Sequence, residues 1–164
     1  MNKEIESVKF GLLLVMLTLV FGIGLGAVFG AAEGTVKSYI SQGIAKHPTV
    51  HNDESESESK IWRYAQRAHF HSTGIAAFSI GLLLLIMQSS LRARLKTATA
   101  VLVGLGGLYP LSWFTMFLLA PAIGRSAAHS HIVTEMFAYI GVATLLTGIA
   151  ILSANLFLGM FRDS

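Results

Sequence analysis

Four long apolar runs dominate this chain and restrict what it can fold into. They cover residues 10–30, 75–87, 98–122 and 137–160, and charged residues make up only 13% of the sequence. An ordinary soluble domain carries about twice that share, and an apolar helix crosses a bilayer with about 20 residues. We therefore predict an all-α integral membrane protein, an up-down four-helix bundle that forms a single domain over residues 1–164.

The predicted spans cover about 9–32, 69–90, 97–121 and 131–160, and an extramembrane acidic loop covers about 34–62. The second apolar run is long enough only if the histidines before it enter the bilayer or nearly so. Within the loop, the apolar spacing predicts that residues 35–46 extend the first helix as far as Pro48.

The acidic stretch at residues 53–59 is low in complexity, which is typical of a flexible, solvated linker. His47 and His51 flank Pro48 and are expected at the surface. In the third span, Pro110 predicts a kink, and Pro121 and Gly124 predict the end of the helix.

Basic residues gather at one end of the predicted bundle, and the positive-inside rule makes that end cytoplasmic. They are Lys3, Lys9, Arg92, Arg94, Lys96 and Arg162. Both termini then lie on the cytoplasmic side, in what we expect to be a bacterial inner membrane, and the acidic loop lies outside. The first apolar run is longer than the hydrophobic region of a signal peptide, so we expect it to be retained.

Two His-x-His pairs open the second and fourth spans: His69 with His71, and His129 with His131. These spans run parallel in an up-down bundle, so both pairs lie at the outer end, and in a square bundle their helices are diagonal. Residues two apart point about 200° apart on a helix, so one histidine of each pair faces inward. The neighbouring residues favour His69 and His131, with His71 and His129 as alternatives.

Two facing imidazoles suit bis-His ligation of haem b and electron transfer. Arg63, Arg67 and Arg125 lie at the same end and would pair with the haem propionates. This hypothesis makes the chain a haem-binding redox subunit near the outer face, with a quinone or another membrane redox protein as partner. The segment Ala68–Gly74 also resembles the histidine-bearing helices of membrane haem proteins, over seven residues.

A non-haem metal site is the first alternative. Glu33 and Glu135 join the histidines at the outer end, and a mixed set of carboxylates and imidazoles suits iron, copper or zinc. His69 and His131 would be the main imidazole ligands, with His71 and His129 available. Such a site would be catalytic or would handle metal, and the sequence leaves open whether the chain is an enzyme.

The second alternative is a cofactor-free accessory or assembly subunit, with the histidines as interfacial anchors. Gly22, Gly26 and Gly30 are spaced by four residues and form a groove that lets another helix approach closely. The groove would pack on a helix of this chain, on a second copy or on a partner subunit. The net charge of +3 forms no basic stripe, which argues against nucleic acid. The lack of cysteine excludes disulfides and thiolate ligands.

Overall fold

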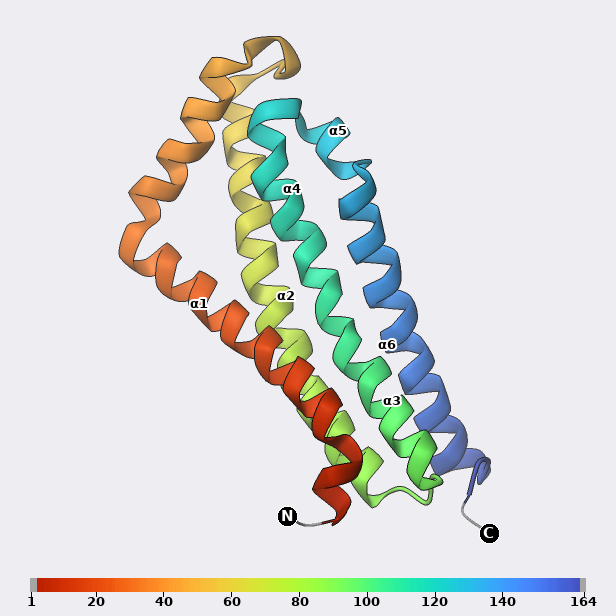
Figure 1. Cartoon of the computed structure of the whole chain (residues 1–164). Coiled ribbons are helices and arrows are strands. Elements are labelled where there is room, and N and C mark those ends of the chain that lie inside the picture. Colours follow the sequence, from red (N-terminus) through yellow and green to blue (C-terminus); the bar gives the residue numbers. More distant parts are fainter. Residues whose placement is uncertain (1–2, 163–164) are drawn as a thin grey trace.

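The structure is a computed structural model that describes residues 3–162, and its long helices run alongside one another (Figure 1). The helices are α1 (Lys3–Lys46), α2 (Glu54–Gln88), α3 (Ala93–Leu105), α4 (Tyr109–Ile123), α5 (Arg125–His129) and α6 (Ile132–Leu158). Two short 3-10 turns lie between α1 and α2 (η1, Pro48–Val50) and between α3 and α4 (η2, Gly106–Leu108).

Within the described residues, four helices are long and apolar enough to cross a membrane: α1, α2, the combined α3–α4 and α6. This confirms the all-helical prediction and is consistent with an integral membrane protein. The start of α1 and the end of α6 lie at the same end of the molecule, which we call the terminal end (Figure 1). The opposite end, which carries η1 and α5, is called the histidine end.

The helices do not form the square that the sequence suggested. α4 lies between α2 and α6, and α1 packs on α2 and on α3 (Figure 1). The reason is a close approach of α1 to α3, where a Cβ on Gly104 would lie 2.8 Å from the carbonyl oxygen of Gly11. A Cβ on Gly107 would likewise overlap Thr18 of α1. Glycines therefore let α1 pack closely against the part of the third span that lies towards the terminal end.

The glycine groove of α1 is filled by α2 over its first half. A Cβ on Gly22 would lie 2.8 Å from the Cβ of Ser72, and one on Gly26 would lie 2.6 Å from Cε1 of His69. At Gly30 no atom lies within 4 Å of that position. The groove ends beside a kink, because Ala32 has non-helical backbone angles (φ −139°, ψ 32°).

The acidic stretch is helical, so its assignment as a flexible linker is wrong. α2 begins at Glu54, where the Asp53 side chain caps the helix by accepting a hydrogen bond from the backbone N–H of Glu56 at 2.8 Å. Carboxylates in the first turn also complement the helix dipole, and Lys60 pairs with Glu56 at 2.8 Å. The expected extension of the first helix to Lys46, before Pro48, is confirmed.

The third span is interrupted beside Pro110 and ends at Gly124, as predicted, but Pro121 lies inside α4 rather than at its end. The turn η2 separates α3 from α4 directly before Pro110, and α4 ends at Ile123 before Gly124, whose φ of 82° suits glycine. Two hydrophobic cores result. One lies towards the terminal end around Val15, Leu83 and Val103, and the other lies towards the histidine end around Ile40, Ile61 and Phe117.

Candidate functional site

His69 faces α1 and is held there by a backbone carbonyl group. Its Nδ1 lies 2.7 Å from the carbonyl oxygen of Gly22, and its ring covers Gly26. The ring of Phe29 meets it edge-on with centroids 6.3 Å apart. Because a carbonyl oxygen only accepts, Nδ1 carries a proton in this contact, and in the neutral imidazole the lone pair is then on Nε2.

His71 faces α4, where aromatic rings surround it. Its ring centroid lies 5.3 Å from that of Tyr109 and 5.8 Å from that of Trp113. The guanidinium of Arg67 lies 4.6 Å from the centroid of the same Trp113 ring, a cation–π contact. The two histidines of this pair therefore serve different helix interfaces, as their angular separation predicts.

The histidines of the second pair lie where the chain enters α6. His131 is the N-cap of α6, and its Nδ1 accepts a hydrogen bond from the backbone N–H of Val133 at 3.3 Å. His129 ends α5 and lines a cavity of about 200 Å³ together with Glu135, Trp113 and Tyr139.

The structure does not bring His69 and His131 together. His69 packs against α1, whereas α6 is separated from α2 by α4. The mixed carboxylate site is not assembled either, since Glu33 is exposed beside the kink of α1 and pairs with Lys37 at 2.6 Å. Among residues 3–162 there is no group of three or more His, Asp or Glu side chains placed to hold a metal ion.

The three predicted arginines do come together. Arg63, Arg67 and Arg125 line one pocket of about 290 Å³ with Lys60 and Tyr64. This basic pocket lies on the side of α2 that faces α4, next to Trp113, and His69 lies on the side that faces α1. Of the histidines on α2, His71 is therefore the one that shares a neighbour, Trp113, with the basic pocket.

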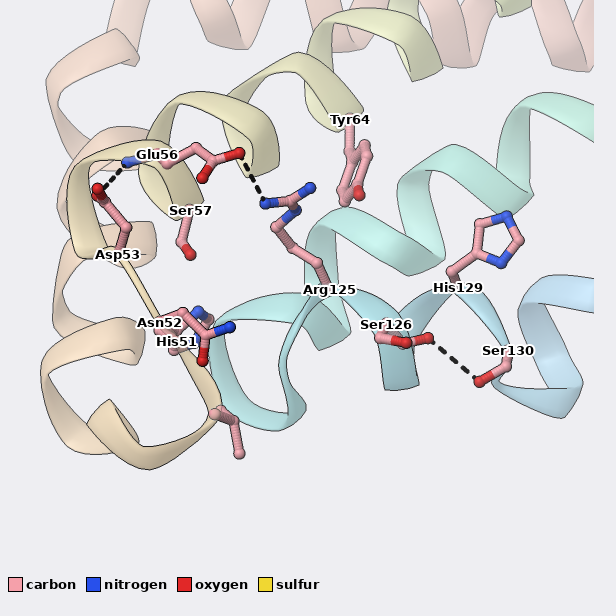
Figure 2. A pocket seen from close by; sticks show the side chains of 11 residues that line it. His51, Asn52, Asp53, Glu56, Ser57, Tyr64, Arg125, Ser126, His129 and Ser130 are labelled. Atoms are coloured by element: carbon pink, nitrogen blue, oxygen red, sulfur yellow. Dashed lines mark hydrogen bonds and ion pairs between the residues drawn. The ribbon is translucent and has the colours of Figure 1, made fainter.

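A larger pocket of about 480 Å³ lies at the histidine end, between the start of α2 and α5 (Figure 2). Asp53, Glu56, Arg125 and His129 line it. His51 also lines it and was expected at the surface, but it is only 7% exposed. Its Nε2 lies 3.1 Å from the carbonyl oxygen of Pro121, so this imidazole is buried against the end of α4.

Trp113 is the main residue of this end that the sequence did not identify as functional. Arg67, His71 and Tyr64 of α2 all contact its ring, the last with centroids 5.9 Å apart. Its buried Nε1 has no hydrogen-bond partner among the described residues. The available signal was its position after Pro110 in the same half of the bundle as the arginines, but sequence spacing does not show which face of the third span meets α2.

No protein-family model, no curated protein and no solved structure matches this chain. The assignment of function therefore depends on the geometry of its own residues.

Proposed function

We propose that this chain is a membrane subunit that binds haem b and transfers electrons, with Nε2 of His69 as an axial ligand. The carrying observation is the 2.7 Å contact between Nδ1 of His69 and the carbonyl oxygen of Gly22. Metal-ligating histidines nearly always donate their other ring N–H in this way, which fixes the tautomer and raises the basicity of the ligating nitrogen. Bound haem would supply the one-electron chemistry.

Two glycines of α1 also support a haem site at His69. The ring of His69 fits only because residue 26 has no side chain, since a Cβ there would lie 2.6 Å from Cε1. One turn further along, Gly30 has nothing within 4 Å of its Cβ position. The open helix surface at Gly30, one turn from the residue that the imidazole covers, suits the close approach of a flat ligand.

His131 is not assigned as the second ligand, because α4 lies between α2 and α6. In the proposed arrangement the helices alternate up and down, both termini are cytoplasmic and the histidine end faces outwards. A quinone in the bilayer and a redox protein outside are the matching partners.

An absorbance spectrum of detergent-purified protein from haem-sufficient cells tests the proposal. We expect a Soret band, with α and β bands after reduction by dithionite. His69→Ala removes the ligand and Gly26→Leu displaces the imidazole, so both variants should lose most of the bound haem. His131→Ala is the matched control, and we expect it to keep its spectrum.

Colourless wild-type protein, or His69→Ala protein with full haem content, would refute the assignment. Elemental analysis of the same samples separates the alternatives. Stoichiometric iron, copper or zinc without a Soret band would favour the non-haem site, whereas protein without metal or haem would favour an accessory subunit.

A further inference from the structure

We propose that the basic pocket of Lys60, Arg63, Tyr64, Arg67 and Arg125 binds a phosphate group, supplied by the headgroup of an anionic phospholipid. This inference does not depend on the haem assignment, because the pocket opens on the α4 side of α2 and His69 packs on the α1 side. It also gives the three arginines a different ligand from the haem propionates.

The positive charge of the pocket is poorly neutralised within the chain. Four cationic side chains line it, and Glu56 is the carboxylate seen to pair with them, 2.8 Å from Lys60 and 3.6 Å from Arg125. In Figure 2, Arg125 reaches between Glu56 and Tyr64. The buried Nε of Arg125 has no hydrogen-bond partner in the described part of the chain, so a donor is left for an outside acceptor.

Helix geometry gathers these donors into one place. Residues three and four apart are neighbours on a helix, so Lys60, Arg63 and Arg67 follow one stripe of α2, and Arg125 approaches from α5. The ring of Trp113 helps to position the guanidinium of Arg67, which lies 4.6 Å from the ring centroid. Arginine forks match the oxygens of phosphate in pairs, and the Tyr64 hydroxyl adds a further donor.

The depth of the pocket points to a lipid. At a rise of about 1.5 Å per residue, Arg67 lies about 32 Å along α2 from Gln88. That length is close to the hydrocarbon thickness of about 30 Å, so a bilayer that begins near Gln88 ends at the level of Arg67. Trp113 contacts Arg67 and Tyr64 at this depth, and aromatic residues favour the membrane interface. A lipid phosphate would therefore meet the pocket at headgroup depth.

Native mass spectrometry of the full-length protein in detergent tests this inference, with phosphatidylglycerol, phosphatidylcholine and inorganic phosphate as separate probes. We expect retained phosphatidylglycerol, weaker retention of phosphatidylcholine, and little phosphate alone. Loss of a charged hydrogen bond usually weakens binding by about tenfold or more, so Arg63→Gln with Arg125→Gln should cost at least that in phosphatidylglycerol affinity. Arg94→Gln, an exposed arginine at the terminal end, is the control and should keep it.

Equal retention of phosphatidylglycerol by the double variant and the wild type would overturn the inference, as would equal retention of the two lipids. Tight binding of inorganic phosphate alone would show that the source is a soluble anion. If the double variant instead loses a Soret band present in the wild type and retains lipid, the arginines serve haem propionates and the inference fails. The helical circular dichroism of the double variant checks that it is folded.

Discussion

At the scale of single residues, His51 shows how a histidine in a loop becomes structural. The last carbonyl groups of a helix have no partner within it. Gly124 N–H bonds to Ala120 at the end of α4, and His51 Nε2 lies 3.1 Å from the next carbonyl oxygen, that of Pro121. The imidazole thus caps α4 from a loop that is distant in sequence.

We predict that His51→Ala lowers the free energy of unfolding by about 1–2 kcal/mol, because the buried carbonyl of Pro121 loses its donor. For a chain of this size that corresponds to a fall in Tm of a few degrees, roughly 2–4 °C per kcal/mol. Thermal unfolding in one detergent measures it. His47→Ala, at an exposed position, should shift Tm little, and a His51→Ala protein as stable as that control would contradict the capping role.

The sequence predicted the composition of the histidine end better than its contacts. The three arginines lie together as their spacing suggested, because they share one end of two neighbouring helices. Spacing could not show whether His69 and His131 meet, because that depends on which helices are adjacent. His51 was assigned to the surface because no local pattern reveals a contact with Pro121, 70 positions away.

At the scale of helices, the crossing of α1 and α3 decides the arrangement. Gly104 faces the backbone of Gly11, where a Cβ would lie 2.8 Å from a carbonyl oxygen. We predict that Gly104→Leu forces the two helices apart and destabilises the protein by about 1–3 kcal/mol, the usual cost of overpacking. Resistance to unfolding by sodium dodecyl sulfate is the measurement.

Gly81 of α2 provides the control for this crossing, because no atom lies within 4 Å of its Cβ position. Gly81→Leu adds the same side chain to a helix without a clash and should leave the resistance nearly unchanged. Similar losses in both variants would mean that a leucine in any span is harmful, and that the Gly11–Gly104 contact has no special role. The sequence showed that glycines pack helices, but α1 carries glycines on more than one face, and spacing did not show which face meets α3.

At the scale of the whole molecule, the four-span prediction follows from hydrophobicity alone and agrees with the helices found. The length of α2 before its apolar run did not follow from it. α2 starts at Glu54 rather than near residue 69. The Asp53 cap, the carboxylates of the first turn, which complement the helix dipole, and the Glu56–Lys60 ion pair stabilise a polar helix. Its composition alone had indicated a linker. A second core around Ile40, Ile61 and Phe117 then joins these extensions into one folded end.

The orientation of the whole molecule can be tested with single cysteines, because the natural sequence contains none. Ser55 is exposed near the start of α2, and Ala93 is exposed between the two arginines at the start of α3. If Arg92 and Arg94 hold their end in the cytoplasm, a membrane-impermeant maleimide should label Ser55→Cys in intact spheroplasts. Ala93→Cys should react only after lysis. The reverse pattern would place the histidine end in the cytoplasm and would remove the outside redox partner from the proposal. Labelling of both variants before lysis would mean that the helices do not span the membrane as a single oriented bundle.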